Sequence, residues 1–516
     1  MLANSRSLVP DNDAGRVTMV ARRLCLSGLV VLAAACRPAM AAPVVLVAVH
    51  ADDTWQGNPR LPDFSFAGYH MSGGPLPRVP AVTDAKTFGA KGDGVTDDTQ
   101  ALQRALDATN RGALVLPAGR YVLGDTIRLP RSHIVLRGDG PDKTILIVPR
   151  SLSEVHPLGD PLASRFHGFV EVRGSLPESK LGDVAAAAQR GDLQLRLGAP
   201  TNVKAGELVR IRMGNADGLL RTILGGGLEP GPQTAKDYDY YVDWVVPIAK
   251  VEGATLTLTR PLRVDVRPEW KPEVLAFQPT IEEVGIEDLS FEFPGVPKKE
   301  HLEEDGFNAI YIRTVTNAWV RNVTVTDADN GIELEDCRSC QVDTVQFRAA
   351  RRTVPSGHHA LWAKESQDCL FVDFRIETRY EHDVTVEAFA NGNVFMRGSG
   401  QAMSLDHHRN APYENLFTDL DVGSPANLWK SGGDRDRGPH AGARETLWNV
   451  RHRGHPMPLP GAGDFDKRVD AGWPLLNLVQ VEGYAPTSQR DNVWVYAAPD
   501  GPPNLYEAQL KKRRGL

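Results

Sequence analysis

Short apolar runs return at a nearly constant interval between residues 308 and 433. Their first buried positions are predicted to be Ile310, Ile332, Leu361, Val384, Met403 and Leu428, at spacings of 22, 29, 23, 19 and 25 residues. A second set of runs keeps similar spacing at Val342, Phe371, Val394 and Leu416. Strand patterns with such a period, separated by turns, are typical of a solenoid whose stacked coils share one core. We therefore predict an all-β protein, a single-stranded right-handed parallel β-helix.

The N-terminal region is predicted to be a signal peptide over residues 1–41. Two arginines precede an apolar run at 24–36, and the tripeptide at 39–41 offers a small-residue cleavage site. The apolar run is too short to span a bilayer stably. We expect a secreted or periplasmic protein, with lipoprotein anchoring at Cys36 and translation from Met19 as alternatives.

The charge balance argues against one class of partner. The 516 residues carry a formal net charge of −7, and no cluster rich in lysine and arginine occurs before the last few residues. Nucleic acid is therefore not expected as a partner. No later apolar run is long enough to predict a stable membrane span.

The rest of the chain divides into three segments. Residues 42–174 are predicted to hold an N-terminal segment, a capping helix over 98–109 and the first coils, because a solenoid needs its open end covered. Residues 175–270 alternate strictly between apolar and polar, which predicts a small inserted antiparallel β lobe. Such a lobe would either brace the solenoid or border its groove, and its removal should leave a foldable solenoid. Residues 271–516 are predicted to form the main coils and a C-terminal tail.

Three cysteines follow the predicted cleavage site: Cys337, Cys340 and Cys369. No second pair and no histidine lies at zinc-ligand spacing from the first two. Five residues separate Glu335 from Cys340 and Lys364 from Cys369. We therefore expect Cys340 and Cys369 at equivalent places of adjacent coils, either stacked in the core or bridged.

The opening coils carry a family resemblance. The stretches FGAKGDGVTDDT at 88–99 and LVLPAGRY at 114–121 resemble the opening of the pectate-lyase-like superfamily, which includes polygalacturonases, rhamnogalacturonases, polysaccharide lyases and phage tailspikes. The resemblance implies the β-helix fold and an extracellular role in cleaving a polysaccharide. The polygalacturonase pattern of Asn-Thr-Asp, Asp-Asp, Gly-His-Gly and Arg-Ile-Lys is absent, since Asp327-Ala328-Asp329 only approximates its second part.

Outward positions of successive coils should form ladders on one face of the solenoid. One predicted row contains Tyr311, Glu333, Trp362, Thr385, Ser404 and Trp429, and a second contains Arg313, Glu335, Lys364, Glu387 and Asp406. The bends add His358, His359, His382, His407, His408 and Arg409. Stacked carboxylates roughly 5 Å apart repel each other unless a cation lies between them. This ladder is therefore the candidate site, with a solvated ion-pair ladder as the alternative.

Two reactions fit these side chains. β-Elimination on a uronic-acid polymer needs a base, for which Lys364, His382, His407 and His408 are candidates. The substrate carboxylate would be neutralised by Arg409 or by Ca²⁺ held by Glu335, Glu387 and Asp406. Hydrolysis instead needs a carboxylic acid and a carboxylate, here Glu387 and Asp406. The missing polygalacturonase pattern favours the lyase over the glycoside hydrolase.

Sugar binding is assigned to Trp362, Trp429, Glu333 and His359, because aromatic faces stack on sugar rings. A non-catalytic glycan-binding solenoid is a further alternative, although the histidine cluster argues against it. The sequence therefore predicts a secreted polysaccharide lyase.

Overall fold

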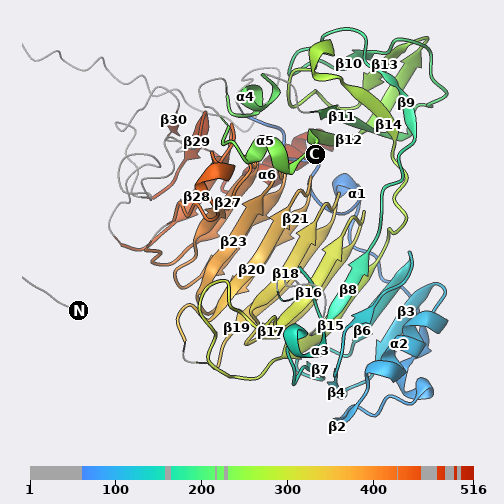
Figure 1. Cartoon of the computed structure of the whole chain (residues 1–516), viewed down its shortest axis with the longest axis vertical. Coiled ribbons are helices and arrows are strands. Elements are labelled where there is room, and N and C mark those ends of the chain that lie inside the picture. Colours follow the sequence, from blue (N-terminus) through green and yellow to red (C-terminus); the bar gives the residue numbers. More distant parts are fainter. Residues whose placement is uncertain are drawn as a thin grey trace, which may run out of the picture. The chain divides into compact units, whose positions relative to one another are not determined.

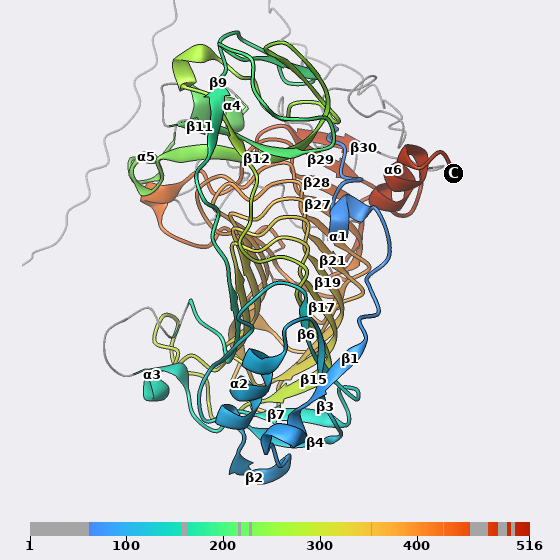
Figure 2. The ribbon, with the colours of Figure 1, turned by 90° about the vertical axis from the view of Figure 1, so that its right-hand side faces the viewer.

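The coils of the computed structural model stack into a right-handed parallel β-helix (Figures 1 and 2). The structure describes residues 61–156, 164, 166–214, 218–225, 230–351, 353–426, 428–454, 473–482, 493–496 and 501–516. All of them belong to the unit Val45–Leu516. The predicted signal peptide region lies outside the described residues.

One parallel sheet of seven strands carries the predicted ladder, and Figure 1 shows its strands side by side. In spatial order they are β26 (Leu405–His407), β23 (Tyr380–Glu387), β20 (Gly357–Lys364), β18 (Asn330–Glu335), β16 (Asn308–Arg313), β8 (Val170–Arg173) and β5 (Ile127–Arg128). Ile310, Ile332, Leu361 and Val384 are Cα partners in series and are all buried. The predicted register is confirmed for these four coils.

The next coil is shifted by two residues from the prediction. Leu405, not Met403, pairs with Val384, and Asp406 pairs with Thr385. Asp406 therefore lies in the row of Glu333 and Trp362 rather than in the row of Glu387. A shift by two residues keeps every inward side chain inward, so the apolar alternation does not reveal it.

The other walls of the solenoid belong to a sheet of 17 strands that pair in parallel. Its strands are β1 (Ala81–Asp84), β2 (Asp93–Asp97), β3 (Gly112–Leu116), β4 (Gly119–Val122), β6 (Ile134–Gly138), β7 (Thr144–Ile147), β15 (Gly285–Glu292), β17 (Trp319–Thr326), β19 (Gln341–Arg348), β21 (Leu370–Val372), β22 (Arg375–Ile376), β24 (Val394–Met396), β25 (Ser399–Gly400), β27 (Leu416–Asp421), β28 (Thr446–Arg451), β29 (Leu476–Val479) and β30 (Val493–Tyr496).

Aromatic rings at equivalent places of successive coils stack in the core. Phe371, Phe395 and Phe417 are Cα partners in β21, β24 and β27. Their ring centroids lie 4.4 and 5.2 Å apart, with interplanar angles of 9° and 7°. Burial of such rings is the main favourable term in a solenoid, because each coil shares its core with its neighbours.

In the part of the chain that the structure describes, the helices are few and short. The longest, α2 (Thr99–Ala108), buries Ala101, Leu102, Ala105 and Leu106 in the core of the first coils, as predicted. The others are α1 (Tyr69–Ser72), α3 (Leu152–Val155), α4 (Leu219–Ile223), α5 (Thr234–Asp237) and α6 (Leu505–Arg513). None of the helices in the described ranges combines the length and apolarity needed to cross a bilayer.

The insertion is an antiparallel sheet of six strands (Figure 1, green). In spatial order they are β10 (Gln194–Arg196), β13 (Thr255–Leu258), β12 (Tyr240–Glu252), β11 (Leu208–Gly214), β14 (Glu273–Ala276) and β9 (Lys180–Asp183). The predicted antiparallel lobe is present. Its predicted end at residue 270 is too early, because β14 pairs with both β9 and β11 inside the lobe.

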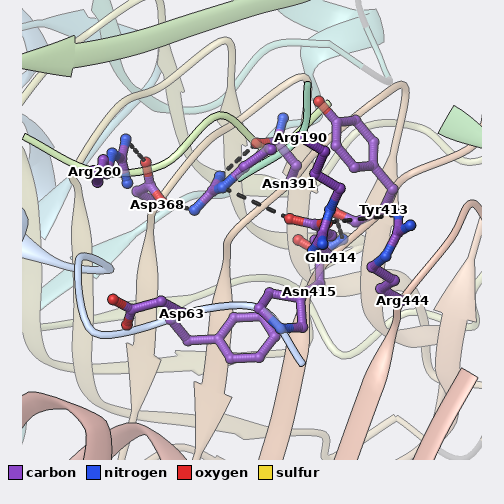
Figure 3. A network of polar contacts seen from close by, with 12 residues as sticks. Asp63, Arg190, Arg260, Asp368, Asn391, Tyr413, Glu414, Asn415 and Arg444 are labelled. Atoms are coloured by element: carbon purple, nitrogen blue, oxygen red, sulfur yellow. Dashed lines mark hydrogen bonds and ion pairs between the residues drawn. The ribbon is translucent and has the colours of Figure 1, made fainter. Parts of the chain in front are cut away.

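Buried ion pairs join this lobe to the coils. Asp368 accepts hydrogen bonds from Arg260 at 2.6 Å and from Arg263 at 2.5 Å. Glu414 accepts one from Arg190 at 2.9 Å (Figure 3). All of these side chains except that of Arg190 are 5 % exposed or less. The contacts argue against the prediction that the lobe can be removed, because its loss would leave buried carboxylates without counterions.

Cys337, Cys340 and Cys369 are buried free thiols. Gln341 and Leu370 are Cα partners, which places Cys340 beside Cys369 on adjacent coils. Of the two arrangements expected from the sequence, the stacked one is present.

Candidate active site

Side chains of alternating charge cross the outward face of the seven-stranded sheet. Arg313, Glu335, Lys364 and Glu387 are Cα partners in series, as the sequence predicted. Lys364 Nζ donates to Glu335 Oε1 at 2.9 Å, and Arg313 Nε lies 3.8 Å from the same oxygen. At the far end, Arg409 Nε donates to Glu387 Oε1. The cations thus separate the stacked carboxylates and relieve their repulsion.

The protonation of this row follows from its neighbours. Burial alone would lower the pKa of Lys364, but Glu335 and Glu387 outweigh burial and raise it. Lys364 therefore stays a cation and is a poor general base, contrary to one sequence expectation. Burial alone would raise the pKa of both carboxyls, yet Lys364 lowers that of Glu335 and Arg409 lowers that of Glu387. Both carboxylates are ionised.

Glu333 behaves differently from the charged row beside it. It is buried, and its Oε1 has no hydrogen-bond partner in the part of the chain that the structure describes. Burial and the neighbouring charge of Glu335 raise the pKa of Glu333 well above its usual range. The Tyr311 hydroxyl donates a hydrogen bond to Glu335, and this bond helps to keep Glu335 ionised. The strand β18 thus presents a neutral carboxyl two residues before an ionised one.

Asp406 positions two histidines. His408 Nδ1–H donates to Asp406 Oδ2 at 2.9 Å, and His382 Nδ1 lies 2.9 Å from the same oxygen. The backbone N–H of Gly432 donates to Oδ1 at 2.7 Å. Although burial would raise the pKa of Asp406, His382 and His408 hold it well below its usual range. An ionised carboxylate on Nδ1 leaves Nε2 of His408 as the basic nitrogen.

Further histidine rings gather beside this pair. His359 and His382 are Cα partners, and their rings stack at 4.6 Å and 18°. The ring of His358 lies 5.3 Å from that of His382. Burial lowers the pKa of His358 and His359 well below their usual value, and that of His382 to about 4. These three imidazoles are therefore neutral near pH 7.

Two predicted site residues face the core instead. Trp429 is fully buried, with its ring 5.1 Å from Trp473. His407 is also fully buried, and its Nε2 lies 3.1 Å from Glu445 Oε2. Strand alternation explains His407, because Asp406 and His408 on either side of it both point outward. Neither a sugar-stacking role for Trp429 nor a catalytic role for His407 is compatible with these positions.

Trp362 points outward but is covered. Its ring stacks on that of His359 at 4.0 Å and 12°, and the ring centroid of Phe166 lies 6.0 Å from that of Trp362. Only 4 % of Trp362 and 2 % of His359 are exposed. Their predicted role as open sugar-binding surfaces is wrong for this arrangement. His359 instead uses Nδ1 in a contact of 2.9 Å with Thr385 Oγ1.

The predicted Ca²⁺ ligands do not converge. Asp406 lies in the other row and faces the histidines, while Glu335 and Glu387 each hold a cationic side chain. The same placement separates the predicted hydrolytic pair, and neither Glu387 nor Asp406 is protonated to act as the acid. Within the described residues, the groups arranged to hold a metal ion are two histidine sets, His301/His358/His382 and His359/His382/His408.

Several residues near the site were missed by sequence reasoning. Arg173 pairs with Arg313 and extends the ladder into β8, which the alternating pattern of residues 170–173 could have revealed. Phe166 and His301 lie on loops, where no periodicity marks them. Glu365 accepts a hydrogen bond from the Tyr238 hydroxyl at 3.3 Å, and burial raises the pKa of Glu365 to about 7.

The approximate polygalacturonase motif has a structural role instead. Asp327 accepts hydrogen bonds from the backbone of Ala350 and Arg351, and Asp329 accepts from that of Gly306 and Phe307. Both aspartates therefore fix loops rather than face a substrate.

Comparison with known proteins agrees with this fold. The family described as "Rhamnogalacturonase A/epimerase, pectate lyase-like" matches residues 82–156, which are the opening coils. Within these residues the chain is similar to the pectate-lyase-like superfamily, and the described coils share its parallel β-helix fold. It is 39 % identical over 93 residues to the mannuronan C5-epimerase AlgE1 of Azotobacter vinelandii. It is 38 % identical over 72 residues to alginate lyase 7 of the same bacterium.

These matches are partial. They cover 16 % and 12 % of this chain, and the chain spans only 7 % and 8 % of the length of the two relatives. Among solved structures, the tailspike protein gp49 from Pseudomonas phage LKA1 covers 78 % of this chain and 63 % of its own, with 14 % identity and a TM-score of 0.49. The match to the A-module of the Azotobacter vinelandii epimerase AlgE4 covers 78 % of this chain and 79 % of that module, with 14 % identity and a TM-score of 0.36.

Proposed function

We propose that this chain is a secreted or periplasmic enzyme that cleaves a uronic-acid-containing polysaccharide by β-elimination. The observation that carries the proposal is the Asp406–His408 pair beside the charged row that ends in Lys364, Glu387 and Arg409. The partial matches to a mannuronan epimerase and an alginate lyase support a uronate polymer as the substrate class.

His408 is the base in this proposal. Its Nε2 takes the C5 proton, the electron pair forms the C4–C5 double bond as the C4–O4 bond breaks, and the leaving O4 takes a proton from water. Asp406 fixes the ring and stabilises the imidazolium that forms. The side chain of His408 is 11 % exposed, whereas that of His382 is 2 % exposed, so His408 is the more accessible of the two.

The neighbouring cations neutralise the substrate carboxylate, which makes the C5 proton more acidic. Arg409 directly follows His408, and its side chain is 26 % exposed. Lys364 stays protonated beside Glu335 and Glu387. A fixed cation at this place supplies the electrostatic stabilisation that the developing enolate requires.

The product distinguishes this reaction from its alternatives. Incubation with a panel of uronic-acid and neutral polysaccharides should yield an ultraviolet-absorbing unsaturated end on a uronic-acid polymer. Parallel arms with added Ca²⁺ and with EDTA test the Ca²⁺ requirement that the sequence suggested. Reducing ends without the unsaturated product would indicate hydrolysis, and binding without either product would indicate a glycan-binding solenoid. Either result would overturn the proposal.

Hydrolysis remains the second candidate because of Glu333. A neutral Glu333 and an ionised Glu335 on one strand offer the two protonation states that a general acid and its partner carboxylate need. If hydrolysis is the reaction, we expect Glu333→Gln to lower kcat by about 100-fold or more, since the donated proton is lost. The surface variant Glu252→Gln is the matched control. A loss of only a few-fold on a confirmed substrate would remove Glu333 from the chemistry and leave elimination by His408.

A further inference from the structure

Three histidines from separate segments meet at one point beside the candidate site. His301 belongs to the loop between β15 and β16, His358 is the second residue of β20, and His382 lies in β23. One ring nitrogen from each lies within 4.8 Å of the others. The Nε2 atoms of His301 and His358 are 3.2 Å apart. The ring of His301 also lies 5.8 Å from that of His382.

In His358 and His382, the two buried histidines of this set, Nδ1 lies on the side of a carboxylate. His382 Nδ1 lies 2.9 Å from Asp406 Oδ2, and His358 Nδ1 lies 3.7 Å from Glu304 Oε2. Histidine ligands of metal ions usually hold their second ring nitrogen on such an outer carboxylate, which fixes the tautomer and raises the basicity of the ligand. Here that arrangement leaves Nε2 of both rings for one ion.

An unsatisfied buried atom points to the same place. Both ring nitrogens of His382 are buried without a hydrogen bond within the described residues, but Nδ1 lies 2.9 Å from Asp406 Oδ2, whereas no carboxylate contact is found for Nε2. A hydrogen bond between Nε2 of His301 and Nε2 of His358 would explain the short distance between these two atoms, but it would leave His382 Nε2 without a partner. Because an unpaired buried polar atom destabilises a fold, a bound ligand at His382 Nε2 is the simpler explanation.

The one lysine of this loop that lies beside Glu304 is already paired. Lys298 Nζ lies 2.9 Å from Glu304 Oε1, which limits the repulsion between Lys298 and a bound cation.

We propose that Nε2 of His301, His358 and His382 bind one divalent transition-metal ion of the zinc type. Imidazole suits Zn²⁺, Cu²⁺ and Ni²⁺, whereas Ca²⁺ takes oxygen ligands. The ion would tie the loop of His301 to β20 and β23 across the end of the histidine cluster. Because His408 is not a ligand, this site does not depend on the proposed lyase reaction.

The test is Zn²⁺ titration of the whole, EDTA-stripped protein by calorimetry, with Ca²⁺ in a parallel run. We expect one Zn²⁺ per chain, no Ca²⁺ binding at this site, and a higher Tm in the presence of Zn²⁺. His301→Ala should abolish this Zn²⁺ binding, and Glu304→Gln should weaken it by about 10–100-fold. His301 is exposed, so its variant should fold, which circular dichroism checks.

The control is His70→Ala, which removes another exposed histidine and should leave Zn²⁺ affinity unchanged. Unchanged binding by His301→Ala would overturn the proposal. Binding that survives in His301→Ala but is lost in His359→Ala would place the ion in the other histidine set and equally overturn this assignment. A protein that takes up no Zn²⁺ would do the same.

Discussion

Replacing His408 with alanine should lower kcat by about 10²–10⁴-fold on a confirmed substrate, with the fold intact. The imidazole points outward, is partly exposed, and is held by Asp406 through Nδ1. Its removal takes away the proposed base but leaves no core cavity. Initial rates of unsaturated-product formation give kcat, and thermal unfolding reports the fold.

The adjacent residue supplies the contrasting variant. His407→Ala should destabilise the protein by about 1–3 kcal/mol, because the buried Glu445 Oε2 loses the ring nitrogen that faces it, while Oε1 keeps its hydrogen bond from Asn415. Its kcat per folded molecule should stay near that of the wild type. The reverse pattern, with turnover lost in His407→Ala and kept in His408→Ala, would show that the assignment of the two faces is wrong.

Asp406→Asn tests whether Asp406 acts by orienting the ring of His408 rather than by stabilising the fold. The amide keeps the shape but cannot hold both histidines as a charged acceptor, so kcat should fall with little change in KM. Restored activity at higher pH would not be expected, because the defect is the orientation of His408 rather than its proton. A variant with wild-type kcat would remove Asp406 from the mechanism.

The sequence predicted most of the ladder because the physical signal is strong there. Ile332, Leu361 and Val384 are buried, and side chains alternate along a strand, so the next residue of each strand must point outward. Glu333, Trp362 and the other residues of their row could therefore be placed without a structure. Where the coil length changes, a shift of two residues preserves this alternation. That is why Met403 was predicted in the place of Leu405, and Asp406 in the row of Glu387.

Burial by loops was not predictable in the same way. Phe166 lies near Trp362, and His301 reaches His358, but both come from segments without a repeating pattern. An outward tryptophan therefore looked like an open sugar platform, and the convergence of histidines from three segments was not visible. Protonation also depended on the structure, since only the observed pairing shows that Lys364 stays charged while Glu333 does not.

The lobe was predicted as a removable insertion, and the contacts of Asp368 give the opposite expectation. Its carboxylate accepts hydrogen bonds from the guanidinium groups of Arg260 and Arg263, and all three side chains are almost fully buried. Figure 3 shows Arg260 beside Asp368. Desolvating these charges is compensated only while they remain together. The lobe and the coils are therefore coupled through this network.

We expect Asp368→Ala to destabilise the protein by about 3–5 kcal/mol, because two buried guanidinium groups lose their counterion. The matched control is Asp373→Ala, which breaks a pair with Arg397 that is 36–44 % exposed and should cost no more than about 1 kcal/mol. Denaturant unfolding followed by tryptophan fluorescence measures both, and a lobe that unfolds first in Asp368→Ala would appear as a separate transition. If both variants lost the same small amount of unfolding free energy, the lobe would be held by its apolar contacts alone. In that case, excising residues 175–276 should still leave a cooperatively folding solenoid, as the repeat pattern suggested.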